Sequence, residues 1–99
     1  MNFSEALQLL KDGKCVTRLG WNGKGMWLYL VDGSTFEVSR APLNQHFPNG
    51  TKVDYRPHID MRTADGGLCV WTAAQSDILA KDWTEVKARG FEDPNTSSL

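Results

Sequence analysis

Hydrophobic side chains near the start of the chain recur at positions i, i+3, i+4 and i+7, which form one face of a helix. They are Phe3, Ala6, Leu7 and Leu10. Asn2 and Glu5 have capping-box spacing just before this stripe, and Gly13 is placed to end the helix. The pattern predicts an amphipathic helix. Leu9, off the centre of the stripe, gives that helix a second apolar surface that could face a partner subunit.

Alternating and β-rich segments follow. The pattern predicts strands at Cys15–Arg18, Met26–Val31 and Thr35–Val38, the last two joined by a hairpin turn at Asp32-Gly33. Proline and glycine then interrupt the pattern, so residues 39–55 are expected to form a long loop. Loops of that length inside a compact domain are usually functional or mobile.

The second half of the chain predicts a hairpin, a short helix and a final strand. The expected elements are a strand at Ile59–Arg62, a turn at Ala64–Gly67, a strand at Leu68–Trp71, a helix at Ala73–Lys81 and a strand at Trp83–Val86. Thr72 and Gln75 have capping-box spacing at the start of that helix. The predicted fold class is α+β: a small antiparallel sheet with an N-terminal helix and a second short helix. Residues 1–89 would form a single domain, and 90–99 a flexible C-terminal tail.

Size and charge narrow the classes of partner. A chain of 99 residues is expected to form one domain. A net charge of −1 and a pI near 6.0 argue against binding to duplex DNA, which requires a basic face. The sequence has no apolar run of about 18 residues, so no membrane partner is expected. Its opening segment carries Glu5 and lacks the basic region and cleavage site of a secretory signal, so we expect a cytoplasmic protein.

The two cysteines, Cys15 and Cys69, lack the CxxC spacing of a metal or redox site. Each lies among apolar residues, where cysteine behaves as a small hydrophobic side chain. We therefore expect both to pack in the core rather than to form a disulfide, as is usual in cytosolic proteins.

Glycines and tryptophans crowd into the stretch from Gly20 to Leu30. This is not a nucleotide-binding P-loop, because only two residues separate Gly20 from the Gly23-Lys24 pair, where four are required. Backbone N–H groups of such a turn can still bind an anion, with Arg18 and Lys24 nearby. A plain tight turn between strands is an equally good interpretation of the spacing alone.

The aromatic residues indicate a surface for stacking. In the strand around Trp27, the period of two places Trp27 and Tyr29 on one face and Leu28 and Leu30 on the other. One face would be core and the other aromatic. Trp21 is flanked by glycine and asparagine in a turn, and this position favours the interpretation that its ring contacts a ligand. Trp83 is better explained as a core or interface residue.

Catalytic chemistry finds little support in the sequence. His46 and His58 have no partner at a recognisable spacing, and the cysteines have no nucleophile motif around them. A set of His58, Asp60 and Asp65 matches no specific metal-ligand pattern. We therefore predict a protein that is not an enzyme, with no catalytic residues, no metal and no cofactor.

Two long segments together resemble a known family. They are FSEALQLLKDGKCVTRLGWNGKGMWLYL and YRPHIDMRTADGGLCVWTAAQSDILAKDW, and the resemblance covers Asn2 to about Val86. Their most distinctive residues are Trp21-Asn22-Gly23-Lys24-Gly25-Met26 after Arg18, and Gln75-Ser76-Asp77 after Trp71. These resemble the phage Thoeris anti-defence proteins of the second type, which were long classed as a domain of unknown function.

This resemblance implies that the protein acts as a sponge. Members of that family bind cyclic nucleotide second messengers made by bacterial immune systems of the Thoeris and CBASS types, and hold them without cleaving them. The ligands are glycocyclic ADP-ribose isomers and, for some members, cyclic dinucleotides. Members form homotetramers with pockets between subunits, so the implied partners are the cyclic nucleotide and further copies of the chain in the cytoplasm of the infected host. The middle of the chain, 32–54, varies in length in such families and could select the ligand.

The chemistry of a cyclic nucleotide then assigns ligand-binding roles. Bases stack on aromatic rings, phosphates take cations or backbone N–H groups, and ribose hydroxyls take polar side chains. The candidates for the bases are Trp21, Tyr29 and Trp71; for the phosphates Arg18, Lys24 and the glycine-loop amides, including Gly25; and for the ribose Asn22, Asp65 and Asp77, with Ser76 beside Asp77.

Two other functions stay open at this point. A nucleotide-processing enzyme would degrade the ligand rather than hold it. A protein-interaction module would use the aromatic residues as interface hot spots, and small nucleotides would then leave its melting temperature unchanged. Binding of single-stranded nucleic acid would use similar aromatic residues, but the negative net charge weighs against it.

Overall fold

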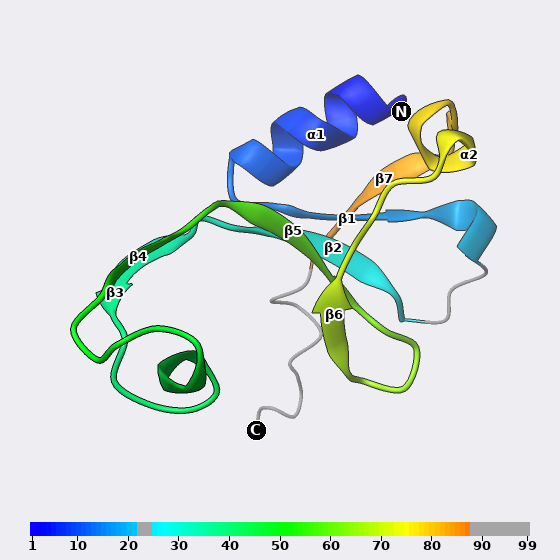
Figure 1. The fold of residues 1–99 in the computed structure, drawn as a ribbon. Coiled ribbons are helices and arrows are strands. Elements are labelled where there is room, and N and C mark those ends of the chain that lie inside the picture. Colours follow the sequence, from blue (N-terminus) through cyan, green and yellow to red (C-terminus); the bar gives the residue numbers. More distant parts are fainter. Residues whose placement is uncertain (22–24, 88–99) are drawn as a thin grey trace.

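The computed structural model describes residues 1–21 and 25–87 (Figure 1). Its helices and strands are α1 (Phe3–Lys11), β1 (Cys15–Arg18), β2 (Trp27–Val31), β3 (Ser34–Glu37), β4 (Lys52–Tyr55), β5 (His58–Arg62), β6 (Leu68–Val70), α2 (Gln75–Ile78) and β7 (Trp83–Val86). Short 3₁₀ turns lie at Leu19–Trp21 and Leu43–Gln45. The expected tail 90–99 lies outside the described residues.

The main sheet of the described residues has five strands in the order β6-β5-β2-β1-β7. All neighbouring strands in it are antiparallel. Helix α1 lies across one face of this sheet, and α2 lies near the end of β7 (Figure 1). The predicted α+β class, with an N-terminal helix and a short second helix, is confirmed.

Local sequence explains both ends of α1. The Asn2 side chain accepts from the backbone N–H of Glu5 at 2.9 Å, and the Glu5 carboxylate accepts from the backbone N–H of Asn2 at 3.0 Å. At the other end Gly13 adopts a φ of +85°, which glycine tolerates best. The N–H groups of Gly13 and Lys14 then bond back to the carbonyls of Leu10 and Leu9, the Schellman arrangement. The predicted capping box and end point are confirmed.

The core lies between α1 and the sheet. Its fully buried members are Ala6, Leu10, Val16, Leu28 and Trp83. Val16 and Leu28 face each other across β1 and β2, directly beneath the buried stripe of the helix. Each large apolar side chain buried this way contributes roughly 1.5–3 kcal/mol. Trp83 was predicted to be a core or interface residue, and the structure places it in the core.

The side chains that alternate with this core point to the other face of the sheet, which we call the open face. Its members on the central strands are Trp27 and Tyr29 of β2 and His58, Asp60 and Arg62 of β5, placed together by the β2–β5 register. The predicted division of β2 is confirmed, because Leu28 is buried and Leu30 packs against the core while Trp27 and Tyr29 lie opposite.

The predicted hairpin at Asp32-Gly33 is wrong. β3 pairs with β4 in a separate two-stranded sheet and not with β2. The physical reason is that β2 already has β1 on one side and β5 on the other, so it offers β3 no free edge. Gly33, at a φ of +89°, turns the chain out of the main sheet instead.

The expected long loop is also shorter than predicted, because Lys52–Tyr55 forms β4. Residues 34–55, which we call the arm, therefore consist of β3, β4 and the connection between them. The arm projects from the body of the molecule (Figure 1). Val38 is its buried residue, held by backbone bonds to Gly50 and Thr51.

The expected helix at Ala73–Lys81 is confined to Gln75–Ile78. The Thr72–Gln75 box is replaced by a bond from the backbone N–H of Ala74 to the Asp77 carboxylate at 3.1 Å. The helix ends early because Trp83 must enter β7 and pair with Arg18 of β1.

The cysteine prediction holds for one residue only. Cys15 is buried, but Cys69 is exposed. Cys69 lies on β6, the edge strand farthest from the strands that α1 contacts, so α1 does not cover it.

Candidate functional site

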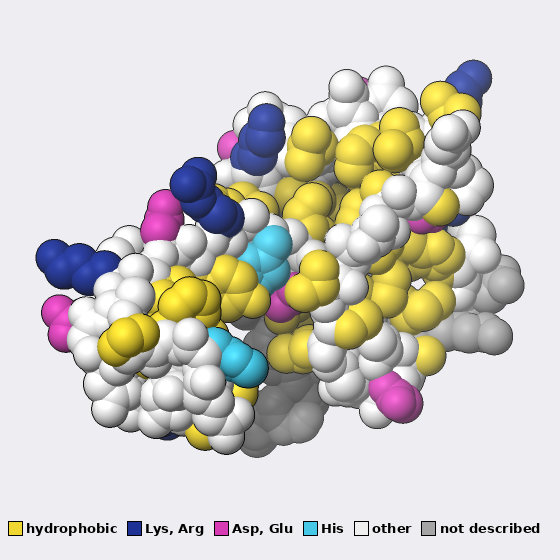
Figure 2. Space-filling model, viewed as in Figure 1, with side chains coloured by type: hydrophobic (Ala, Val, Ile, Leu, Met, Phe, Trp, Pro, Cys, Tyr) yellow, Lys and Arg dark blue, Asp and Glu magenta, His cyan; other side chains and the backbone are white. Residues whose placement is uncertain are grey.

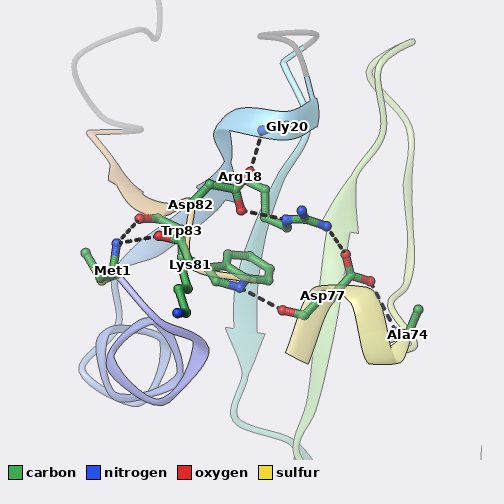
Figure 3. Close-up of polar contacts among 8 residues, drawn as sticks. All are labelled: Met1, Arg18, Gly20, Ala74, Asp77, Lys81, Asp82 and Trp83. Atoms are coloured by element: carbon green, nitrogen blue, oxygen red, sulfur yellow. Dashed lines mark hydrogen bonds and ion pairs between the residues drawn. The ribbon is translucent and has the colours of Figure 1, made fainter. Parts of the chain in front are cut away.

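An ion-pair network joins the end of β1 to the chain around α2. Arg18 donates through Nε to Asp82 at 2.9 Å and through Nη1 to Asp77 at 2.8 Å (Figure 3). Asp82 also accepts from the backbone N–H of Gly20 at 2.7 Å. A Cβ on Gly20 would lie 2.9 Å from that carboxylate oxygen, so a larger residue here would displace the Asp82 side chain.

These contacts set the charge states of the network. The hydrogen bond from Arg18, followed by that from Gly20, lowers the pKa of Asp82 below its usual range. Hydrogen bonds to Asp82 and Asp77 raise the pKa of the Arg18 guanidinium. One cation thus serves two carboxylates, and the network carries a formal charge of −1.

Aromatic rings pack around Trp83 beside this network. Trp21 meets Trp83 edge to face with ring centroids 5.5 Å apart, and Trp71 does so at 6.1 Å. Phe3 of α1 contacts Trp83 at 5.4 Å. The indole N–H of Trp83 donates to the carbonyl of Asp77 at 2.9 Å. Trp21 and Trp71 are therefore half-buried rings supported by the core rather than free loop side chains.

The fold brings four of the predicted site residues together here. Arg18, Trp21, Trp71 and Asp77 form what we call the helix-side cluster, with Asp82 and Trp83 as residues not predicted for the site. Arg18 and Asp77 bind each other, so a phosphate would have to compete with carboxylates for Arg18. The ligand roles predicted for these four residues stay predictions.

The open face carries a shallow hollow of about 350 Å³ over the central strands. Its lining residues are Gly13, Cys15, Trp27, Tyr29, Leu30 and Leu68. The rings of Trp27 and Tyr29 are tilted against each other with centroids 5.7 Å apart. The volume lies within the range of small-molecule sites, which are typically about 300–1,000 Å³, and the walls are aromatic and aliphatic.

Polar groups flank Tyr29 on this face. Its hydroxyl donates to Asp60 at 3.5 Å, and His58 Nε2 lies 3.7 Å from the other carboxylate oxygen of Asp60. His58 stacks on Tyr55 of the arm at 4.9 Å. Burial, and then the Asp60 charge, raises the pKa of Tyr29 above its ordinary value of 10.0, so the phenol stays a neutral donor.

A second hollow of about 240 Å³ adjoins the first and shares Trp27 with it. Gly25 lines this hollow at a φ of +74°. Arg62 donates to the carbonyl of Gly25 at 2.6 Å, which holds a guanidinium at the rim of the glycine-rich stretch. The positively charged side chain of Arg62 therefore lies beside the Trp27–Tyr29 pair.

The remaining predicted residues lie apart from both groups or outside the described residues. Asp65 accepts from Thr63 and from the backbone N–H of Gly67 within the β5–β6 turn, and these bonds lower its pKa. Ser76 is exposed in α2. Asn22 and Lys24 fall outside the described residues.

Four open-face residues of the central strands were missing from the predicted site: Trp27, His58, Asp60 and Arg62. In β5, His58, Asp60 and Arg62 occupy every second position, and this alternation could have indicated that the three side chains share one face of the strand. Their neighbourhood with Tyr29 depends on the β2–β5 register, which no local pattern specifies.

Comparison with known proteins agrees with the resemblance of the two segments. The family model of the Thoeris anti-defense 2-like domain matches residues 1–86. The chain belongs to this family. A curated relative, Thoeris anti-defense 2 of Bacillus phage SP01, is 36% identical over 86 residues, which are 84% of this chain and 91% of the relative.

A non-catalytic role fits an anti-defense domain of this family. In the part of the chain that the structure describes, no three His, Cys, Asp or Glu side chains are placed to hold a metal ion. Among residues 1–21 and 25–87, no helix has the length and apolar character needed to cross a membrane.

Proposed function

We propose that this anti-defense protein is a phage-encoded sponge. It binds cyclic nucleotide second messengers of host immunity, namely glycocyclic ADP-ribose isomers and cyclic dinucleotides, and holds them intact in the host cytoplasm. Loss of the free messenger then blocks signalling of the Thoeris and CBASS types. Family membership supports the anti-defense role, and the open face supports the choice of ligand class.

The aromatic hollow beside Arg62 is the observation that carries this proposal. Trp27 and Tyr29 offer adjacent rings for a base. The guanidinium of Arg62, the cross-strand neighbour of Trp27, offers charge for a phosphate. Base stacking contributes roughly 1–3 kcal/mol per base, and a hydrogen bond to a charged group about 1.5–3 kcal/mol. Two stacks with three or four such bonds reach the roughly −12 kcal/mol of nanomolar binding if the site is preorganised.

The helix-side cluster is the second place where a base could stack. Trp21 and Trp71 present half-buried rings there, but the formal charge of the neighbouring network is −1. The open face carries Arg62 and Asp60, a formal charge of 0, so a dianionic ligand meets less repulsion there. Variants of the two regions separate these alternatives.

We propose a homotetramer with ligand pockets between subunits as the working assembly. The arm supports self-association, because it projects from the body and exposes the aromatic residues Phe36, Phe47 and Tyr55. A monomer would leave these rings in water. A partner copy that covers them would remove this apolar surface from water.

A thermal-shift panel tests ligand binding. It contains glycocyclic ADP-ribose isomers and cyclic dinucleotides, with linear ADP-ribose and NAD as controls. A ligand at 100 times its dissociation constant adds about 2.7 kcal/mol to the stability of the folded state. For a domain of this size that raises Tm by about 10 °C or more. No shift with any nucleotide would favour the protein-interaction alternative.

Substitutions then assign the site. Tyr29→Ala and Arg62→Gln should remove most of the shift if the ligand occupies the open face. Trp21→Ala should remove it instead if the helix-side cluster binds the ligand. Lys11→Gln and Arg40→Gln are the control variants, because both side chains are exposed and neither belongs to the open face or the helix-side cluster.

Recovery of the ligand separates a sponge from an enzyme. After incubation and denaturation of the protein, mass spectrometry should find the cyclic nucleotide unchanged and equimolar to its sites. A linear or hydrolysed product would identify a nucleotide-processing enzyme.

A further inference from the structure

The edge strand β6 is unusually apolar and exposed. Leu68 and Val70 are 64% and 63% exposed, and Cys69 between them is also exposed. Figure 2 shows hydrophobic side chains gathered on the viewed face of the body, where β5 and β6 lie. Edge strands usually carry charge or proline that prevents pairing with another chain, but residues 67–72 contain neither. The opposite edge, β7, does carry such charges, with Glu85 bonded to Lys87 at 3.2 Å.

The hydrogen bonds of β6 show which backbone groups face outward. The N–H of Trp71 donates to the carbonyl of Ile59, and that of Thr63 donates to the carbonyl of Gly67. In an antiparallel ladder, backbone groups of alternate residues face the same partner strand. Residues 67, 69 and 71 therefore face β5, so Leu68 and Val70 direct their N–H and C=O groups to the free edge.

We infer that β6 pairs antiparallel with β6 of a second copy about a two-fold axis at Cys69. Leu68 then bonds to Val70 of the partner copy, and Val70 to the partner copy's Leu68, so that every outward donor meets an acceptor. Cys69 faces its own counterpart as a non-hydrogen-bonded pair, with Cα atoms about 4.5 Å apart. This inference rests on the self-association proposed above and locates one of its interfaces.

The occupant is a second copy because the edge is complementary to itself. Its outward groups are symmetric about Cys69, and the absence of charge in residues 67–72 means that two copies meet without repulsion. Small domains also gain most from further apolar burial, since they bury a smaller fraction of their own surface.

The pairing also changes the candidate site. Leu68 lines the open-face hollow, and residues directly opposite in an antiparallel pair lie on the same face. Val70 of the partner copy would therefore extend the wall of that hollow beyond Leu68. Each hollow is completed by the other copy, and the paired hollows lie side by side on one continuous sheet.

A charge-swap experiment tests the pairing, because the two-fold axis makes residue 69 its own neighbour. Cys69→Lys and Cys69→Glu, each alone, should associate several-fold more weakly than the natural protein, since like charges then face each other. An equimolar mixture should restore association and give mixed assemblies by native mass spectrometry. Circular dichroism and Tm verify that each variant folds.

Oxidative cross-linking gives an independent measurement. With Cys15→Ser, copper-phenanthroline should join two chains through Cys69, because the expected Cα separation suits a disulfide. A Cys69→Ser protein carrying Ser4→Cys, an exposed helix position, measures the background from random collision.

The outcomes separate this inference from the proposed function. Assemblies that persist equally in both charge variants, or cross-linking no greater than background, would overturn the β6 pairing while leaving a tetramer and ligand binding intact. A natural protein that is monomeric would overturn the pairing together with the tetramer. Failure to bind nucleotides in an assembly that does respond to the charge swap would contradict the sponge alone.

Discussion

Arg18 connects parts of the chain that are distant in sequence, since its partners Asp77 and Asp82 lie 59 and 64 positions away. The network fixes the end of β1 against the segment between α2 and β7. Trp83 belongs to the same region, because its indole bonds to the Asp77 carbonyl. A residue that resembles a phosphate ligand in the sequence thus has a structural role in the free protein.

Removing this cation should lower stability and alter its pH dependence. We expect Arg18→Gln to cost about 2 kcal/mol, mainly through the bond to Asp77, whose side chain is 13% exposed. The lowered pKa of Asp82 means that its stabilising contribution is present above the ordinary carboxyl value of 3.8 and is lost as pH falls through the folded-state pKa. Urea unfolding should therefore show the natural protein losing its advantage over Arg18→Gln below about pH 4.

Arg18→Lys is the matched control for that experiment. Lysine keeps the charge but lacks the planar fork that reaches both carboxylates, so its stability should lie between the other two. Equal stability of all three proteins at neutral pH would contradict the role assigned to Arg18.

Sequence reasoning identified the composition of the helix-side cluster better than its chemistry. Trp21, Trp71, Arg18 and Asp77, which come from two separate motifs and were each named as ligand-binding candidates, do lie together. The partners that engage them, Trp83 and Asp82, depend on long-range packing. The position of Trp21 in a turn therefore gave no indication that its ring packs against the core.

At the level of elements, Gly33 is the position that separates the arm from the sheet. Its φ is +89°, and a Cβ there would clash with the backbone of Tyr55 and Pro57, between the end of β4 and the start of β5. Gly50 has nearly the same φ, +88°, but a Cβ on it would meet nothing within 4 Å. Substituting each glycine with alanine therefore separates the cost of a steric clash, present only at Gly33, from the cost of backbone strain, present at both.

Gly33→Ala should destabilise the protein by more than Gly50→Ala. The left-handed conformation alone costs about 1–2 kcal/mol for alanine, which we expect for Gly50→Ala. Gly33→Ala adds a backbone clash, so its cost should exceed that of the control by at least about 1 kcal/mol. Thermal unfolding of the two variants measures the difference, and equal Tm values would show that the arm is not held tightly at Gly33.

The elements themselves were largely predictable, and their pairing was not. Capping spacing located α1, and the period of two in β2 identified its faces. The Asp32-Gly33 dipeptide is a reliable local turn signal, but it carries no information on whether β2 has a free edge. Only the global strand order shows that β1 and β5 occupy both sides.

For the whole molecule, the proposed tetramer makes stability depend on protein concentration. Because unfolding would then accompany dissociation, a tenfold rise in concentration should stabilise each subunit by about 1 kcal/mol. Calorimetry should record a Tm increase of about 4–8 °C for a domain of this size. A Tm that does not change with concentration would indicate a monomer over the range measured.

The attachment of the arm bears on how such a protein can diversify. The chain leaves the main sheet after β2 and returns to it at β5, so the arm is joined to the body only by the neighbouring crossings 31–34 and 55–58. Adding or deleting residues in matched pairs along β3 and β4 would preserve their facing sides without shifting the register of the main sheet. Natural variation can therefore reshape whatever the arm contacts while the Trp83 core and the Trp27–Tyr29 face stay as they are.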